Sequence, residues 1–390
     1  MAKRLLRARW VVPICEPPIE NGVVEIEGDR ISAVRQARPG DPAGEDLGDA
    51  AILPGLVNAH THLEFSLLER PLGTQGMTLP EWIRLVIAQR GSSGEERRAE
   101  AIEAGLAESL AAGVTGVVDI ATTAAYPRPD RAPRVLPLCE SIGFSTARVD
   151  SALAAVEECR AGLSRHGDAG WSPHAPYTVH PRLVERIVDA AVRSDSLVAM
   201  HLAESREELQ LLRDGAGPFR ELLDERSMWD GESIPRGTAA LDYLKQLARA
   251  PRALVVHGNY LNEEEIAFCA AHRERLSVVY CPRTHAYFGH EPYPLQRMLD
   301  AGVRVVVGTD SRASNPDLSV LGELRELWRR HPRLEPSAVL RMATVDAAEA
   351  VGWAGTCGEL RPGVRADWAA VPVESAGADV CEAVLLGNEG

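Results

Sequence analysis

Two histidines separated by a single residue are the first sign of chemistry in this chain. His60 and His62 follow the apolar run 50–53 and the turn residues Pro54-Gly55. Side chains alternate between the two sides of an extended segment, so residues i and i+2 point the same way. Two imidazoles on one side can bind one metal ion. A His-x-His pair alone is more often incidental than functional, so the rest of the chain decides its meaning.

Four later apolar runs also end at a residue that can bind a metal ion or transfer a proton. These residues are His174, His201, His257 and Asp310, and Glu204 follows His201 by three positions. An isolated histidine at such a place is often a core residue, and an isolated glutamate often belongs to a helix N-terminus. The recurrence of such residues at the ends of successive runs is what indicates a common site.

The middle of the chain alternates apolar runs with helical segments, a pattern typical of βα units around a parallel sheet. Eight strands are predicted, and they end near His62, Ile120, Val149, His174, His201, His257, Cys281 and Gly308. Helices are predicted at 95–112, 181–193, 262–271 and 318–330. This pattern predicts an α/β fold with a (β/α)8 TIM barrel, in which reactive groups lie at the C-terminal ends of the strands.

The two ends of the chain have a different pattern, with short alternating stretches separated by turn residues. Residues 22–31 predict a β-hairpin and residues 366–371 predict a strand. We therefore expect a small composite β-sandwich domain of residues 1–53 and 357–390. The barrel is expected to comprise residues 54–356.

Length and composition limit the classes of function. The chain has 390 residues, enough for a large core and two folding units. The formal charge is 42 − 56 = −14, which disfavours nonspecific binding to nucleic acid or to an anionic membrane surface. No apolar run reaches the roughly 18 residues of a membrane span, and residues 1–6 do not resemble a secretion signal. The seven cysteines are scattered without a CxxC motif, so we expect reduced thiols in a cytoplasmic protein.

Several segments resemble motifs of the amidohydrolase superfamily. The motifs are His60-Thr61-His62 after 54–58, His201 in His-Leu-Ala-Glu-Ser, His257-Gly258-Asn259 and Gly308-Thr309-Asp310-Ser311. Segments 172–178 and 314–318 are similar to the branch that contains S-adenosylhomocysteine, methylthioadenosine and 5′-deoxyadenosine deaminases and the triazine chlorohydrolases. Residues 63–66, with Trp82-Ile83 and Val86-Ile87, also resemble the aminodeoxyfutalosine deaminases. The resemblance covers nearly the whole chain.

The resemblance implies one divalent metal ion with four ligands, namely His60, His62, His201 and Asp310. Three neutral imidazoles and one carboxylate suit zinc, with iron or manganese as alternatives, and leave a position for water. Superfamily members with two metal ions usually bridge them with a carboxylated lysine at the end of the fourth strand. The chain has only Lys3 and Lys245, and the predicted fourth strand ends at His174, so we expect a single metal ion.

The same resemblance gives Glu204 and His257 roles at the reacting water and the substrate, and His174 a contact with the substrate. A metal ion lowers the pKa of bound water from about 16 towards 7, so hydroxide forms at neutral pH and can attack a ring carbon. Glu204 can carry the proton of the water to a ring nitrogen, while His257 and Asp310 orient the hydroxide and stabilise the developing charge.

These roles predict a hydrolytic deaminase that releases ammonia from an adenosine-like nucleoside, of the aminodeoxyfutalosine, 5′-deoxyadenosine, methylthioadenosine or S-adenosylhomocysteine type. An alternative is hydrolysis of another heterocycle, such as a triazine, a guanine-like base or a cyclic amide. A catalytically silent binding protein is a third alternative, but such relatives typically lose metal ligands, and every ligand position is filled here. The expected partner is a small-molecule substrate. A homodimer is also expected, because relatives are often dimers.

Four residues are candidate substrate contacts, each with a structural alternative. Glu81 follows Leu-Pro, as in the segment that carries a ribose-binding glutamate in the adenosylhomocysteine deaminases, or it simply begins a helix. Arg148, near the predicted end of the third strand, faces the pocket or pairs on the rim. Arg283 and His285 stand after Cys-Pro, where nucleoside deaminases usually carry Ser-Asn. They can bind a carboxylate or phosphate, or form a buried polar network.

Segment 205–251 is expected to add helices over the mouth of the barrel, or to elaborate its exterior.

Overall fold

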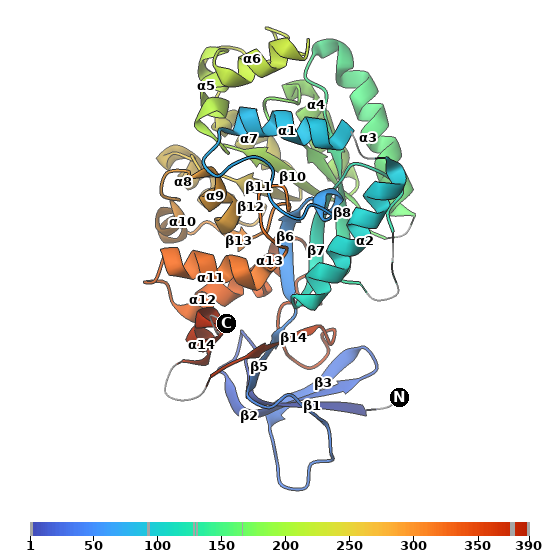
Figure 1. Ribbon diagram of the computed structural model, residues 1–390, viewed down its shortest axis with the longest axis vertical. Helices are drawn as coiled ribbons and strands as arrows, with labels where there is room; N and C mark the ends of the chain where they lie inside the picture. The colour runs from blue at the N-terminus through green and yellow to red at the C-terminus, as the bar shows by residue number, and fades with distance from the viewer. Residues whose placement is uncertain are drawn as a thin grey trace.

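The computed structural model describes residues 3–91, 94–127, 129, 132–165, 167–374 and 379–387. Within these residues, eight parallel strands lie side by side in chain order and form a barrel surrounded by helices (Figure 1). The strands are β6 (Leu56–Thr61), β7 (Val114–Ala121), β8 (Arg134–Ser141), β9 (Gly170–Pro173), β10 (Leu197–Leu202), β11 (Arg252–His257), β12 (Leu276–Tyr280) and β13 (Val305–Val307). Just beyond β13, the backbone N–H of Asp310 donates to the carbonyl of His60 at 3.1 Å, so the last strand returns to the first. The predicted (β/α)8 barrel is confirmed.

Helices follow the strands and cover the outside of the barrel. They are α2 (Glu95–Ala111), α3 (Val149–Ser164), α4 (Pro181–Arg193), α8 (Glu263–Ala271), α9 (Pro282–Phe288), α10 (Leu295–Ala301), α11 (Val320–Arg330), α12 (Pro336–Arg341) and α13 (Val345–Ala350). The four helices predicted from the sequence are confirmed as α2, α4, α8 and α11. Their starts are set by local chemistry. The Asn262 side chain accepts from the backbone N–H of Glu265, whose carboxylate accepts from the backbone N–H of Asn262, a reciprocal capping box.

The third strand differs from the prediction. β8 ends at Ser141, whereas the sequence placed a strand end near Val149, a residue that begins α3. The 3-10 helix η2 (Thr146–Arg148) lies between them. Pro137 conceals the strand in the sequence, because a proline lacks the backbone donor of a sheet residue and is uncommon inside central strands.

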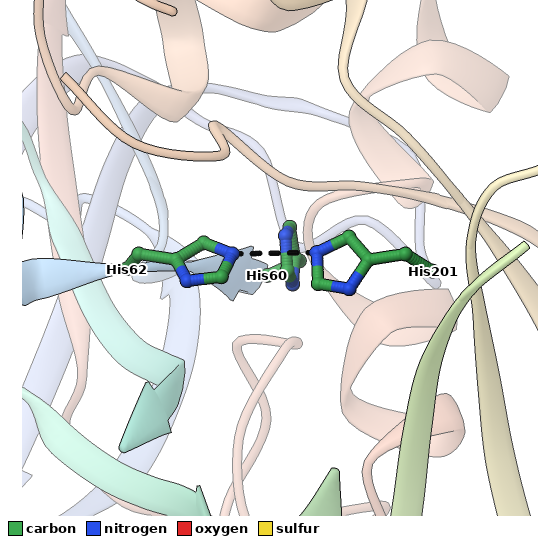
Figure 2. A group of neighbouring side chains, drawn as sticks. All are labelled: His60, His62 and His201. Atoms are coloured by element: carbon green, nitrogen blue, oxygen red, sulfur yellow. Dashed lines mark hydrogen bonds between the residues drawn. The ribbon is translucent and has the colours of Figure 1, made fainter. Parts of the chain in front are cut away.

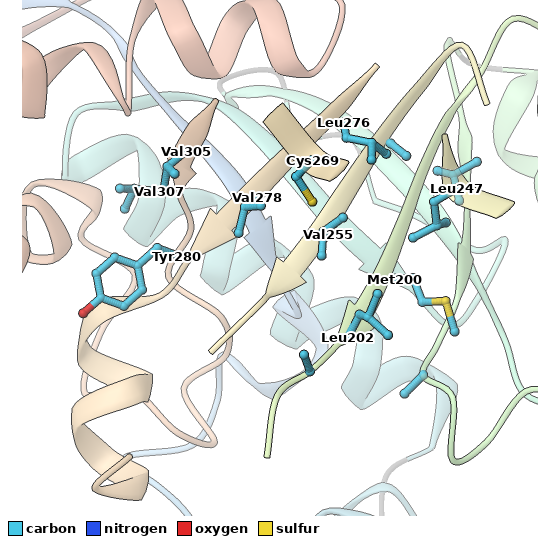
Figure 3. Packing of buried hydrophobic residues seen from close by; sticks show 14 of the residues in the cluster. Met200, Leu202, Leu247, Val255, Cys269, Leu276, Val278, Tyr280, Val305 and Val307 are labelled. Carbon is cyan, nitrogen blue, oxygen red and sulfur yellow. The ribbon is translucent and has the colours of Figure 1, made fainter. Parts of the chain in front are cut away.

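Hydrophobic side chains alternate along the strands between the interior of the barrel and the layer beneath the helices. In β11, Leu254 packs inside the barrel, while Ala253 and Val255 pack outward. Figure 3 shows the outward-facing Met200, Val255 and Val278 on neighbouring strands within the cluster that joins strands and helices. Each strand is therefore buried on both sides, as expected for a parallel sheet.

Both ends of the chain contribute strands to a second sheet, which lies below the barrel in Figure 1. Its strands are β1 (Lys3–Val11), β2 (Ile19–Glu27), β3 (Arg30–Gln36), β4 (Glu45–Asp46), β5 (Ala50–Pro54) and β14 (Trp368–Pro372). The predicted hairpin is the antiparallel pair of β2 and β3, and β14 pairs with β5, so the composite β domain is confirmed. The chain passes from β5 into the barrel through Gly55, where a Cβ atom would lie 2.0 Å from Thr115 Oγ1.

The last helix does not follow the expected domain boundary. α14 (Val380–Leu386) packs against α11 and α12 of the barrel, and Arg325 donates to the carbonyl of Val384 at 3.2 Å. The sequence placed residues 357–390 in the β domain. The apolar face of α14 instead covers barrel helices, a contact between distant segments that no local pattern reveals.

Two helical connections cover the C-terminal end of the barrel. α1 (Leu79–Gly91) lies in the connection after β6, and α5 (Arg206–Asp214), α6 (Pro218–Glu225) and α7 (Ala240–Leu247) form the connection between β10 and β11. Arg84 of α1 donates to the Glu225 carboxylate of α6 at 2.9 and 2.7 Å. The helices predicted in segment 205–251 are confirmed. Among the described residues, no helix is long and apolar enough to cross a membrane.

Candidate active site

Three histidines converge at the C-terminal end of the barrel. His60 belongs to β6, His62 follows it, and His201 belongs to β10. His62 Nε2 and His201 Nε2 lie 3.3 Å apart, and the His60 ring lies between them in Figure 2. One nitrogen from each ring lies within 4.8 Å of those of the other two. The register of β6 against β7 shifts between Asn58 and Thr61, at the place where the two histidines turn into the barrel.

The donor set fits a divalent cation. His60 is fully buried, and neither of its ring nitrogens has a hydrogen-bond partner in the part of the chain that the structure describes. Burial lowers the pKa of His62 and His201 well below 6.5, and His60 lowers both further. These imidazoles are therefore neutral and carry free lone pairs. Leaving a buried polar atom unpaired costs roughly 1–3 kcal/mol, a cost that a bound cation removes.

Asp310 lies beside this cluster. Its Oδ1 is 3.6 Å from His60 Nε2 and 3.7 Å from His62 Nε2, while its Oδ2 accepts from Ser314 Oγ at 2.8 Å. The close approach of the two strand ends depends on Gly308, where a Cβ atom would lie 2.9 Å from the backbone of His60. Asp310 is thus held at the side of the metal ligands by both its backbone and its side chain.

His174 orients one of the ligands. The carbonyl of His174 lies 2.9 Å from His201 Nδ1. A proton on Nδ1 leaves the lone pair of Nε2 directed at the other histidines, which is the usual way in which a backbone carbonyl fixes the tautomer of a metal-binding histidine. The His174 ring itself lines the cavity, with Nδ1 2.7 Å from Thr178 Oγ1.

A second pair of groups, Glu204 and His257, lies next to the histidine cluster. Glu204 Oε1 is 3.3 Å from His257 Nε2, and the Tyr177 hydroxyl donates to Glu204 Oε2 at 3.5 Å. Burial raises the pKa of Glu204 well above 4.5, and the Asp310 and Glu208 carboxylates raise it further. Burial lowers the pKa of His257 well below 6.5. A raised pKa makes the Glu204 carboxylate a stronger base, which suits a group that takes up a proton and returns it.

Unusual backbone angles aim these side chains. His257 has φ of 69°, Asp310 of 56° and Ala203 of 53°, in a region that non-glycine residues seldom adopt. Along β11, strict alternation would place His257 on the outward side with Val255. The left-handed conformation turns it towards the histidine cluster instead. The Glu208 carboxylate accepts from the backbone N–H groups of Ala203 and Glu204 at 2.9 and 2.8 Å and holds the turn.

A cavity of about 280 Å³ opens from the histidine cluster towards α1 and the segment that follows α6. Its deep end is polar and is lined by His62, His174, His201, Glu204, His257 and Asp310. Most of the rest of its lining is apolar, with Trp82 and Ile83 of α1 among the side chains. Two larger hollows lie at the opposite end of the barrel, around Arg134 and Trp353. Because the reactive groups are absent from them, the smaller cavity is the candidate active site.

Arg148 and Glu81 are not among the residues that line this cavity. Arg148 is exposed in η2, beyond the true end of β8. The Glu81 carboxylate is also exposed and accepts from Thr78 N at 3.1 Å and from Thr78 Oγ1 at 2.7 Å, so it caps the start of α1. The structure therefore favours the structural alternative for both residues, and their contact with a substrate stays a prediction.

Arg283 and His285 are also outside the cavity lining. Arg283 donates to Glu323 Oε1 at 2.7 Å and to Asp317 Oδ1 at 2.7 Å, and so fixes the loop that follows Asp310. His285 is buried, and its ring packs edge-on against that of Tyr280 at a centroid distance of 5.7 Å. Arg283 thus belongs to the polar network that was the alternative to substrate binding, whereas neither ring nitrogen of His285 has a hydrogen-bond partner among the described residues.

Three residues of the site were missed by sequence reasoning, namely Tyr177, Arg90 and Glu140. Tyr177 stood inside the recognised segment 172–178 but received no role. Glu140 stands one residue before the end of β8. A correct prediction of this third strand would have identified Glu140 as a candidate site residue. Arg90 lines the cavity from α1, with its guanidinium bound to the Glu64 and Glu140 carboxylates, and nothing local in the sequence signals that position.

A barrel that gathers three histidines and a proton-transferring pair at the C-terminal ends of its strands has the architecture of a metal-dependent hydrolase. The chain belongs to the amidohydrolase family, whose model matches residues 51–384. The resemblance noted in the sequence is thereby confirmed.

Several relatives and solved structures are similar over most of the chain. A 5-methylthioadenosine/S-adenosylhomocysteine deaminase of Moorella thermoacetica is 29% identical over 94% of this chain and 85% of its own length. An adenosine deaminase of Xanthomonas campestris with bound zinc is 25% identical, with a TM-score of 0.78, over 98% of this chain and 88% of that one. Helicobacter pylori aminofutalosine deaminase has a TM-score of 0.85 at 23% identity, over 98% of this chain and 95% of that one.

Proposed function

We propose that this protein is a metal-dependent aminohydrolase that releases the exocyclic amino group of an adenosine-like nucleoside as ammonia. The observation that carries the proposal is the contact of Glu204 with His257 beside the cluster of His60, His62 and His201, at the deep end of one cavity. Deaminases of adenine nucleosides among the relatives that align over most of the chain support it.

One metal ion would be held by His60, His62, His201 and Asp310. Zinc is the proposed metal because three imidazoles and a carboxylate suit it, and a solved neighbour that is 25% identical contains it. Iron and manganese are alternatives. When bound, such an ion lowers the pKa of water to near 7 and so provides a nucleophile at neutral pH.

Glu204 is proposed to move the proton between water and substrate. The oxygen of the water forms a bond to the amino-bearing ring carbon while its proton passes to the Glu204 carboxylate. Glu204 then delivers this proton to the adjacent ring nitrogen. The remaining proton of the attacking water passes to the amino group as the carbon–nitrogen bond breaks, so a carbonyl forms and ammonia leaves. The raised pKa of Glu204 suits a group that must take and return a proton near neutral pH.

The other polar groups of the deep end would bind and orient. His257, neutral and 3.3 Å from Glu204, faces the place where negative charge develops on the attacking oxygen. Asp310 is kept in one orientation by its bond from Ser314. His174 is proposed to contact the ring of the substrate from the cavity wall.

Ammonia release by protein loaded with zinc, iron or manganese tests the proposal. The panel comprises adenosine, 5′-deoxyadenosine, methylthioadenosine, adenosylhomocysteine, aminodeoxyfutalosine, guanine and an aminotriazine. We expect release from at least one adenine nucleoside, together with one metal ion per chain by elemental analysis. Release from guanine or the triazine alone would reassign the substrate, and silence across the panel would contradict the deaminase.

The other proposals about this protein have weaker support. The triazine hydrolases among the solved neighbours are 20–22% identical and support the fold alone, so they do not favour a triazine substrate.

All seven cysteines are free thiols, as is usual in a reducing compartment such as the cytoplasm. The homodimer stays a prediction.

A further inference from the structure

One face of α1 forms a wall of the cavity. Six of its residues line the cavity at spacings i, i+3, i+4, i+7, i+8 and i+11, which place them on one side of the helix; they are Leu79, Trp82, Ile83, Val86, Ile87 and Arg90. We call these six residues the α1 wall. Ile142 and Met228 add apolar side chains to the same cavity. Beyond the polar deep end, a ligand therefore meets an apolar surface that contains one arginine.

The arginine of the α1 wall is already bound on every nitrogen. Arg90 Nε donates to Glu64 at 3.0 Å, one terminal nitrogen donates to Glu140 at 3.0 Å, and the other donates to Glu64 at 2.7 Å and to Glu140 at 3.4 Å. Both carboxylates are less than one-tenth exposed, at 7% and 4% of their side-chain surfaces. Few donors of Arg90 are left for a ligand.

This group offers an anion no free cation. Glu64 and Glu140 both face the single guanidinium of Arg90, so its positive charge is already paired within the protein. An anionic group of a substrate would lose its water against the apolar α1 wall and would find no free cation there to bind.

We propose that Glu64 and Glu140 hold Arg90 in a form that excludes anions, so that the accepted nucleoside carries an uncharged, apolar group on its 5′ carbon, such as a methyl or alkylthio group. This inference rests on the proposed function. Deamination places the base against Glu204 and His257, and the sugar with its 5′ group then extends towards the α1 wall.

A competing arrangement would use Arg226, which also lines the cavity. Arg226 follows α6, is exposed, and has no side-chain partner among the residues that the structure describes. A substrate carboxylate could therefore reach it at the rim. Ion pairs at exposed positions contribute little free energy, so this contact does not offset the cost of desolvating an anion at the apolar α1 wall, and the apolar 5′ group is favoured.

The test uses two adenosines that differ in charge but little in size, with 5′-propylthio and 5′-carboxymethylthio groups. We expect kcat/KM to favour the propylthio compound by roughly tenfold or more, because the carboxylate of the other compound is desolvated at the α1 wall without a cation to bind. Glu64→Gln keeps the shape but frees Arg90, and should reduce this preference by about tenfold. Arg84→Gln removes an arginine from the exposed side of the same helix and serves as the matched control, with the preference unchanged.

Calorimetric binding of the two deaminated products gives a readout that does not require turnover, and the same preference is expected. Wild-type preference for the carboxymethylthio compound, or an unchanged preference in Glu64→Gln, would overturn the inference. A loss of activity in Arg226→Gln that is confined to the carboxylate compound would assign recognition to the rim. If neither compound is deaminated and neither product binds, the proposed function fails, and the inference with it.

Discussion

Two buried polar regions line the same cavity and use their hydrogen-bonding capacity in opposite ways. In the cluster of His60, His62 and His201, both ring nitrogens of His60 and one of His62 have no partner within the described part of the chain. At the α1 wall, every nitrogen of Arg90 donates to a carboxylate. Both regions hold ionisable side chains away from water, so burial alone does not distinguish them.

This difference in hydrogen bonding indicates which region binds a ligand. An unpaired buried polar group costs free energy, and such a cost is typical of sites that a bound ion or substrate completes. At the α1 wall the hydrogen-bonding groups already have partners, so a ligand gains few hydrogen bonds there. This network excludes ligand groups that would compete with the carboxylates for Arg90. Substitutions in the first region should therefore change turnover, while those in the second should change stability and selectivity.

The largest expected effect is on turnover. Glu204→Gln removes the proton carrier and should lower kcat by roughly 10³-fold, while the metal content stays at that of the wild type. The measurement is ammonia release together with elemental analysis. Glu207→Gln, the same change three residues along and outside the cavity lining, is the control. Near-normal turnover in Glu204→Gln would show that another group carries the proton.

A large effect on stability is expected from the satisfied region. Arg90→Met leaves the Glu64 and Glu140 carboxylates without their cation and should lower the free energy of unfolding by about 2–4 kcal/mol at neutral pH. Arg90 holds the pKa of Glu140 below 4.5, so this stabilisation is present above pH 4.5 and is lost as the pH falls through the lower folded-state pKa. Urea denaturation across this range measures it.

Arg84→Met provides the comparison for Arg90→Met. Arg84 pairs with Glu225 at 2.7 Å between α1 and α6, with the two side chains 36% and 52% exposed. An exposed pair of this kind contributes about 0–1 kcal/mol. Equal losses of stability in the two variants would contradict the distinction between the buried and the exposed pair.

A smaller effect is expected at Arg283, where the structure favours the polar network over a substrate contact. Arg283→Met breaks the pairs with Asp317 and Glu323 and should lower the free energy of unfolding by about 1–3 kcal/mol. The ratio of kcat/KM between substrates should stay the same, because Arg283 does not line the cavity. A changed substrate preference with unchanged stability would restore the substrate contact that the sequence suggested.

The smallest effect is expected at Arg148. Its side chain is exposed in η2 and outside the cavity lining, so Arg148→Ala should change stability by no more than about 0.5 kcal/mol. Substrate titrations should give kcat and KM values close to those of the wild type. A marked rise in KM would mean that η2 moves towards the substrate.

The four proposed metal ligands were assigned from family resemblance, and their positions at strand ends are local signals. His60 and His62 are two positions apart at a strand end, and His201 and Asp310 end later apolar runs, so a barrel topology brings the four residues to the same end of the barrel. The roles of Glu204 and His257 at the reacting water were inferred from family resemblance, and the structure places the two groups 3.3 Å apart. Glu140 was missed for a local reason too, since Pro137 hid the strand that carries it.

The barrel, the composite β domain and the residues of the deep polar end follow from patterns in the chain. These patterns are alternating burial, helix caps and polar residues at strand ends, and each depends on neighbouring positions. The pairing of Arg90 with Glu64 and Glu140, and of Arg283 with Asp317 and Glu323, follows only from how distant segments pack. These partners lie tens of residues apart, and whether a charged side chain faces a cavity or a counterion depends on which segments pack against it.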